Sequence, residues 1–173
     1  SGRAMPVTSG SVPVRARALR HRNTTIMIDF DFAALRRIGL TNPLAARLAA
    51  HDGGLPARIA SVHRGALVLH DGLHEFPARL PGAQSAAPAV GDWALFGHDD
   101  HGDAWVRALV EPMNDLVRRT ANGTRQRLAA NVDTALLVMG LDGDFNLRRL
   151  ERYLMLAQSC GVAPVVVLTK GDL

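Results

Sequence analysis

Residues 164–172 read Pro-Val-Val-Val-Leu-Thr-Lys-Gly-Asp, an apolar run that ends in a polar turn. Short continuous apolar runs of this kind are typical of strands buried in a parallel sheet. Lys170, in the turn, is the only lysine among the 20 lysine and arginine residues of the chain. A lone lysine in a composition that otherwise uses arginine indicates a position where a guanidinium would not serve.

The four residues after the predicted strand match the pattern Asn/Thr-Lys-x-Asp, with which GTPases read guanine. In that pattern the flexible lysine stem lies along the base, a role that the rigid guanidinium of arginine fills poorly. The aspartate accepts hydrogen bonds from guanine N1 and N2, two donors that adenine lacks. We therefore predict that Lys170 packs on guanine, that Asp172 selects it, and that Thr169 ties the loop to the site. The alternative is an ordinary polar turn, because a four-residue pattern also recurs by chance.

The residues before this turn predict a βαβ unit. A continuous apolar run at 135–141 indicates a strand buried on both faces. Leu147, Leu150, Leu154 and Ala157 then recur at helical spacing after an Asn146 cap. A right-handed crossover returns the chain to residues 165–168. Residues 169–172 then lie at the carboxyl end of the second strand, where open α/β sheets bind ligands.

Residues 55–113 predict a small all-β domain. Short β-prone runs alternate with turn signals, including Asp71-Gly72, and no run has helical length. The expected strands are 57–63, 66–70, 73–80, 90–96 and 104–110. Five strands in about sixty residues favour a barrel of the OB type, with an SH3-like barrel as the structural competitor.

The remaining segments complete the predicted organisation. Residues 1–22 form a disordered basic tail, 23–54 a short helical arm, 114–130 an arginine-rich linker, and 131–173 the α/β part. The fold class is therefore multidomain, β followed by α/β. With Cys160 alone and no secretory signal, we expect a cytoplasmic location.

Basic side chains predict a polyanionic partner. The net charge is +4, and arginines recur on the predicted barrel and in the linker. The candidate RNA contacts are Arg58, Arg64, Arg79, Arg107, Arg118 and Arg119. Trp93 and Trp105 lie in alternating strands, so we expect core packing, with base stacking as the alternative. The acidic segment 98–103 is interpreted as a solvated turn, and no metal site is predicted in the chain.

Four segments resemble the ribosome small-subunit-dependent GTPases of the RsgA (YjeQ) type. They are Val90-Gly91-Asp92-Trp93, residues 129–133 (Ala-Ala-Asn-Val-Asp), residues 145–154 (Phe-Asn-Leu-Arg-Arg-Leu-Glu-Arg-Tyr-Leu) and residues 166–173. The resemblance covers about residues 30–173. Its specificity lies in the order of the parts, with a barrel first and a base-reading motif before any phosphate loop. That order is the one in this circularly permuted family.

The resemblance implies a GTPase that binds the small (30S) ribosomal subunit late in its maturation, with the OB barrel on 16S rRNA. It further implies GTP or GDP with Mg²⁺ as cofactors, a monomer, and a C-terminal domain that binds Zn²⁺. The chain contains neither a Gly-x-x-x-x-Gly-Lys-Ser/Thr phosphate loop nor the Asp-x-Pro-Gly switch.

We therefore expect a fragment that holds the first βαβ of an incomplete GTPase domain. It should bind RNA, bind nucleotide weakly and contain no catalytic residue. The unpaired sheet edge leaves three alternatives: the βαβ unit is loosely ordered alone, pairs with another copy, or belongs to a longer chain. The alternative function is a non-catalytic OB-fold RNA-binding module that uses the βαβ unit for docking.

Overall fold

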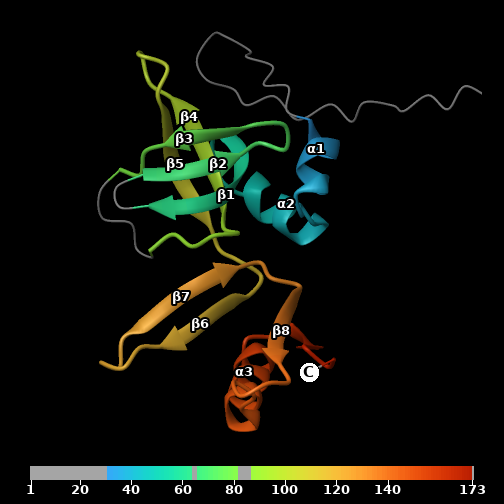
Figure 1. Cartoon of the computed structure of the whole chain (residues 1–173). Helices are drawn as coiled ribbons and strands as arrows, with labels where there is room; N and C mark the ends of the chain where they lie inside the picture. The colour runs from blue at the N-terminus through green and yellow to red at the C-terminus, as the bar shows by residue number, and fades with distance from the viewer. Residues whose placement is uncertain (1–30, 64–65, 82–86, 173) are drawn as a thin grey trace, which may run out of the picture.

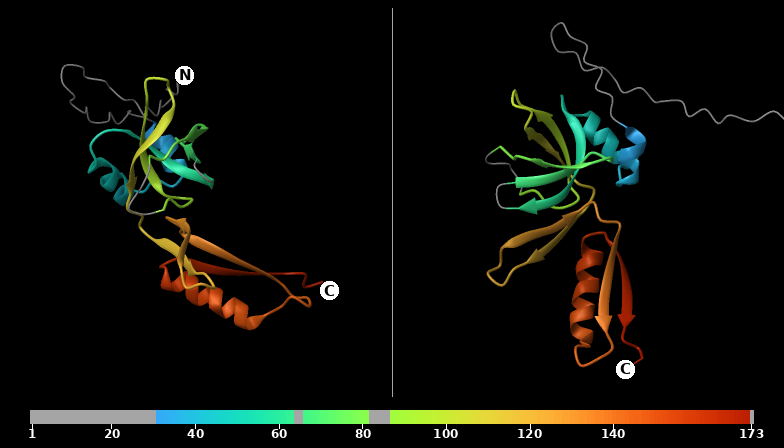
Figure 2. Two further views of the ribbon diagram at one scale, coloured as in Figure 1. Left: turned by 90° about the vertical axis from the view of Figure 1, so that its left-hand side faces the viewer. Right: turned by 45° about the horizontal axis from the view of Figure 1, so that its top comes forward.

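The computed structural model describes residues 31–63, 66–81 and 87–172 of the chain (Figure 1). Within these ranges the strands form three sheets, of five, two and two strands. Figure 2 shows the five-stranded sheet and the βαβ unit at opposite ends of the molecule. The predicted tail at 1–22, the start of the helical arm to residue 30, and Arg64 lie outside the described residues.

Two short helices, α1 (Phe32–Arg37) and α2 (Asn42–Ala49), precede the five-stranded sheet. The Asp31 carboxylate caps α1 by accepting a hydrogen bond from the Ala34 amide at 3.0 Å. Proline in the first turn of α2 presets the helical φ. The helices bury Leu35, Leu44 and Leu48 against the sheet. Among the helices that the structure describes, α3 included, none is long and apolar enough to cross a membrane.

Five antiparallel strands appear where the sequence predicts them, in the spatial order β3-β2-β1-β4-β5. They are β1 (Leu55–His63), β2 (Ala66–His70), β3 (Glu75–Ala78), β4 (Trp93–His98) and β5 (Ala104–Val110). The sheet curves until its two edge strands meet at Arg79. The Arg79 amide donates to the Ala104 carbonyl and the Val106 amide donates to the Arg79 carbonyl, both at 2.9 Å.

Strand β4 is buried on both faces because each face meets a different apolar cluster. Ala94 and Phe96 pack inside the curved sheet with the side chains of β1, β2, β3 and β5. Trp93 and Leu95 point the other way, against α1 and α2. Trp93 is fully buried, so the expectation of core packing is confirmed for this tryptophan. Full burial of a large apolar side chain stabilises the folded state by about 1.5–3 kcal/mol relative to leaving it exposed.

The segment predicted as a linker contains regular structure. Strands β6 (Asp115–Arg119) and β7 (Arg125–Ala130) form an antiparallel hairpin. Its turn is closed by a 2.9 Å hydrogen bond from the Thr120 amide to the Thr124 carbonyl, and Gly123 has a φ of +79°. Asn122-Gly123 is a turn signal that the high arginine content obscured.

The predicted βαβ unit is present. Strand β8 (Thr134–Gly140), helix α3 (Leu147–Ser159) and strand β9 (Ala163–Thr169) follow one another, and β8 pairs in parallel with β9. Asn146 caps α3 by accepting from the Arg149 amide at 2.9 Å. The expectation that β8 is buried on both faces is wrong for this chain. Leu136 and Val138 are 65% and 62% exposed, because α3 covers the opposite face only.

Candidate functional site

The predicted base-reading residues follow β9 at the carboxyl edge of the parallel pair, beside the turn that follows β8. The Leu141 amide donates to the Thr169 carbonyl at 2.9 Å, which ties the two turns together. Thr169 itself has its hydroxyl 3.5 Å from the Met139 carbonyl, at the outer limit for a hydrogen bond. This edge therefore brings together two loops that are about thirty residues apart in the sequence.

Lys170 reaches across this edge toward β8. Its φ of +59° lies in the left-handed region, and its ammonium forms an ion pair with the carboxylate of Asp142. The hydrogen bond from Lys170 lowers the pKa of Asp142, with a further contribution from the Asp144 amide. Asp142 was not among the site residues that the sequence predicted.

Asp172 is exposed at the end of this loop. Across the described ranges, 31–63, 66–81 and 87–172, its carboxylate has no hydrogen bond or ion pair. Both carboxylate oxygens can therefore accept hydrogen bonds from a ligand. The loop thus presents one fixed cation and one free double acceptor.

Of the candidate RNA contacts, Arg58 is partly buried and packs against the backbone of neighbouring segments. It donates to the carbonyl oxygens of Ile38 at 2.6 Å, Gly91 at 3.4 Å and Asn131 at 3.1 Å. Burial lowers the pKa of Arg58, and the charge of Asp133 acts in the opposite sense. This arginine holds the helical arm, the sheet and the start of the α/β part together, so each of its three nitrogens already donates to a backbone carbonyl.

Arg79 and Arg107 flank Trp105 on the outer side of β5. The Arg79 guanidinium lies over the Trp105 ring, 5.6 Å from its centroid, and Arg107 is exposed two residues further along the strand. Trp105 is only partly buried, so the expectation of core packing is wrong for this tryptophan. Asp103 pairs with Arg79 at 3.1 Å, and Asp99 accepts from the Trp105 indole at 2.9 Å. We call Arg79, Trp105 and Arg107 the basic strip.

Arg118 and Arg119 are exposed on the β6–β7 hairpin. Arg118 donates to the Gln126 side chain at 3.0 Å, and Arg119 lies directly opposite Arg125 in the strand register. Two like charges opposite each other are unfavourable unless an anion lies nearby. In the described part of the chain, no group of three or more His, Cys, Asp or Glu side chains could hold a metal ion.

Sequence comparisons identify the family. A family model described as RsgA GTPase matches residues 110–173. The small ribosomal subunit biogenesis GTPase RsgA of Xanthomonas oryzae pv. oryzae is 40% identical over 165 residues, which cover 84% of this chain and 43% of the relative. The chain belongs to the RsgA GTPase family. A second relative, RsgA 2 of Lactiplantibacillus plantarum, is 35% identical over 80% of this chain and 42% of its own length.

Solved structures show the same fold. The crystal structure of YloQ, a circularly permuted GTPase, matches with a TM-score of 0.53 and 22% identity, over 70% of this chain and 42% of YloQ. YjeQ from Thermotoga maritima matches with a TM-score of 0.53 and 20% identity, over 68% of this chain and 41% of that protein. The RsgA-family chain thus spans less than half the length of the relatives that it matches.

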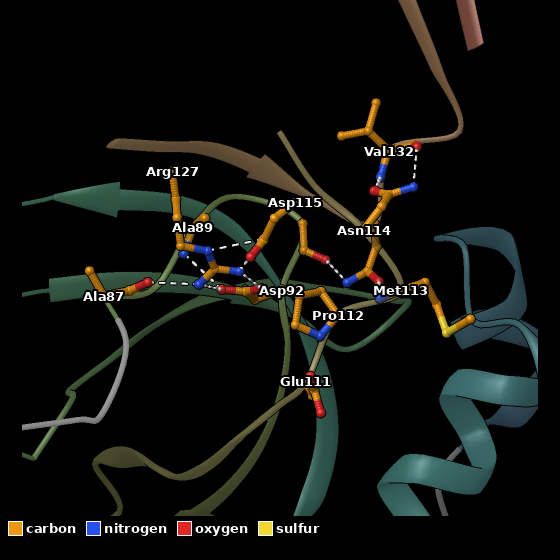
Figure 3. Close-up of polar contacts among 12 residues, drawn as sticks. Ala87, Ala89, Asp92, Glu111, Pro112, Met113, Asn114, Asp115, Arg127 and Val132 are labelled. Carbon is orange, nitrogen blue, oxygen red and sulfur yellow. Dashed lines mark hydrogen bonds and ion pairs between the residues drawn. The ribbon is translucent and has the colours of Figure 1, made fainter. Parts of the chain in front are cut away.

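Arg127 connects the hairpin of this RsgA-family chain to its five-stranded sheet (Figure 3). It binds both carboxylate oxygens of Asp92, at 2.8 and 3.1 Å, and its Nε donates to Asp115 at 3.0 Å. The Asp92 side chain is 2% exposed and also accepts from the Ala89 amide at 2.8 Å. Burial lowers the pKa of Arg127, but the hydrogen bonds to Asp115 and Asp92 outweigh it and raise the pKa overall.

A second set of contacts fixes the start of the α/β part. Asn114 forms a pair of 2.9 Å hydrogen bonds with the backbone of Val132 (Figure 3). Asn131, at a φ of +52°, bonds through its side chain to the Gly91 carbonyl and the Met113 amide. Gly91 is required here, because a Cβ on it would lie 2.1 Å from the Ala130 carbonyl oxygen. Two of the family-like segments, 90–93 and 129–133, therefore meet in space.

These junction residues were missed by the sequence analysis. Asp92 and Asn131 lie inside the two segments that carry the family resemblance, which was the available signal. Nothing in the local sequence indicated that Asp92 would pair with Arg127, which is 35 residues away. The junction makes the hairpin and the five-stranded sheet one connected unit.

Proposed function

We propose that this chain belongs to a factor that binds and hydrolyses GTP during late maturation of the small ribosomal subunit. The proposal rests on the loop at the carboxyl edge of β8 and β9, where Lys170 is paired with Asp142 and Asp172 has no partner among the described residues. The printed names of the curated relatives, small ribosomal subunit biogenesis GTPases, support the proposal. A cytoplasmic location and a monomeric full-length protein are part of it.

In the proposed site the chain reads the base. The Lys170 stem packs on the guanine ring and the Asp172 carboxylate accepts from guanine N1 and N2. Thr169 ties the loop to β8. GTP or GDP with Mg²⁺ would supply the phosphate chemistry. Residues beyond this chain would hold the phosphates and Mg²⁺, and a further domain would hold Zn²⁺.

We propose that the five-stranded sheet is a barrel of the OB type rather than an SH3-like barrel. Support comes from the strand order β3-β2-β1-β4-β5, since β4 returns to lie beside β1 as in the Greek key of the OB fold. Two hydrogen bonds at Arg79, just after β3, join this end of the sheet to β5. A barrel of this class offers an outer strand surface to single-stranded nucleic acid. The basic strip lies on such a surface.

We propose that the basic strip binds 16S rRNA, with Arg118 and Arg119 on the hairpin as additional phosphate contacts. Arginines beside a partly exposed tryptophan combine the two features that single-strand binders use, cationic contacts to phosphates and an aromatic face for a base. Arg58 adds little, because its donors bond to backbone carbonyls. Arg64 stays a prediction.

Reversing the charge of the strip, with Arg79→Glu and Arg107→Glu together, is expected to weaken RNA binding. The slope of the logarithm of the RNA association constant against the logarithm of the salt concentration should also become less steep by about 1.5. Each lost phosphate contact accounts for about 0.7–0.9 of this change. Filter binding of an rRNA fragment at several salt concentrations measures both. The matched control is Arg148→Glu with Arg152→Glu, which changes the charge equally on the exposed side of α3. Equal losses in the two double variants would show that net charge alone governs binding.

The enzymatic part is tested by GTP hydrolysis with the full-length protein. We expect guanine nucleotide binding, and turnover that rises when isolated small ribosomal subunits are added. Binding to the subunits without any guanine nucleotide binding would favour the alternative, a non-catalytic RNA-binding module that docks through its βαβ unit.

A further inference from the structure

The side chain of Lys170 crosses the end of the neighbouring strand instead of extending into solvent. A Cβ added to Gly140, the last residue of β8, would lie 3.3 Å from Cδ of Lys170 and 2.9 Å from a carboxylate oxygen of Asp142. A side chain at position 140 would therefore crowd both partners of the ion pair. Because glycine has no side chain, the aliphatic part of Lys170 can pass close to the backbone at position 140 and reach Asp142.

Asp142 is itself held in place by the turn after β8. Its Oδ1 accepts a hydrogen bond from the Asp144 amide at 3.2 Å, while Oδ2 pairs with the Lys170 ammonium. The Asp142 side chain is 24% exposed, whereas that of Lys170 is 51% exposed. The Asp142 carboxylate is charged at neutral pH, as an ordinary aspartate is, and the ion pair with Lys170 lowers its pKa further. A fixed anion thus stands at the far end of a flexible cationic side chain.

We propose that Asp142 is a positioning residue that orients Lys170 for guanine. A free lysine loses substantial rotamer freedom when it is ordered on a ligand, and an ion pair formed beforehand removes part of that loss. Asp142 acts from the β8 loop, so the base is read by both loops at this edge. The inference rests on the proposed function, because it assumes that Lys170 contacts the base.

The ion pair could either orient Lys170 toward the ligand or hold it away from the ligand, and the geometry favours the first. A latch would hold the lysine away from the ligand, and removing Asp142 would then tighten nucleotide binding. Here the paired lysine stem lies at the carboxyl edge of the sheet, close to Gly140, and Asp172 follows it by two residues in the same loop. Removing Asp142 is therefore expected to weaken binding by about 5–20-fold, the scale of one lysine's rotamer freedom.

A double-mutant cycle on the full-length protein tests the inference, with the dissociation constant of a fluorescent GDP analogue as the measurement. The variants are Asp142→Asn, Lys170→Met and their combination. Asp142→Asn should cost about 5–20-fold alone but less than about twofold when Lys170 is already methionine. Asp142→Glu should recover part of the loss. Asp144→Asn, the same change two residues away, is the control and should have no effect.

Three results would overturn the inference: an equal loss from Asp142→Asn in both backgrounds, no loss at all, or tighter binding. The GDP affinity of Lys170→Met alone shows whether the proposed function fails, independently of the role of Asp142. If Lys170→Met leaves GDP affinity unchanged, the lysine does not contact the base, and the site itself is wrongly assigned.

Discussion

Replacing Arg127 by leucine is expected to lower the free energy of unfolding of the five-stranded sheet by about 3–5 kcal/mol. The reason is the partner left behind, since the Asp92 side chain is 2% exposed and would be buried without a cation. Contact between the hairpin and the sheet should weaken at the same time, because the pair of Arg127 with Asp92 joins them. Urea denaturation followed by Trp93 fluorescence measures the effect, in a Trp105→Phe background that leaves one tryptophan in this chain.

Arg125→Leu is the matched control, because Arg125 lies exposed on the same strand. Its change should stay within about 0.5 kcal/mol. A loss below about 1 kcal/mol, or an equal loss in Arg125→Leu, would show that the Asp92 carboxylate does not depend on this arginine.

Replacing Asp172 by asparagine in the full-length protein is expected to weaken GDP binding by at least about 100-fold. Each hydrogen bond to a charged acceptor contributes about 1.5–3 kcal/mol, two such bonds are lost, and 1.4 kcal/mol is a factor of ten. Xanthine carries an oxygen where guanine has its N2 amine, so the asparagine amide can donate to it. XDP affinity should therefore rise in the same variant.

Competition of GDP, XDP and ADP against a fluorescent nucleotide gives all three affinities. Asp144→Asn serves as the control, since Asp144 is an exposed carboxylate at the same edge of the sheet. If Asp172→Asn left the ratio of GDP to XDP affinity unchanged, Asp172 would not be the residue that reads the base.

The sequence predicted those parts of the fold whose signals are local. Turn signals and alternating apolar residues located the five strands, and the period change at residue 131 located the βαβ unit. Gly140 and Asp142 were invisible as site residues, because their relation to Lys170 exists only once β8 and β9 pair in parallel.

Arginine was the hardest residue to assign from sequence. Arg58 and Arg107 both lie in β-strands beside apolar residues, yet Arg58 bonds inward to three backbone carbonyls and Arg107 is exposed. The different environments of the two arginines depend on the helical arm, because the Ile38 carbonyl accepts a hydrogen bond from Arg58. The hairpin was missed for a related reason, since each of its two strands carries two arginines and composition alone describes the segment as polar.

The contacts of Arg58 also constrain the order in which the chain can mature during its own synthesis. Its partners lie at Ile38, Gly91 and Asn131, so the five-stranded sheet is fully anchored once residue 131 has emerged. Residues 132–173 follow over about 2–8 s at about 5–20 residues per second. Small β domains fold in milliseconds to seconds. The surface proposed for RNA is therefore ready before the loop proposed to read the base has emerged, so a nascent chain could engage RNA while it is still unable to bind nucleotide.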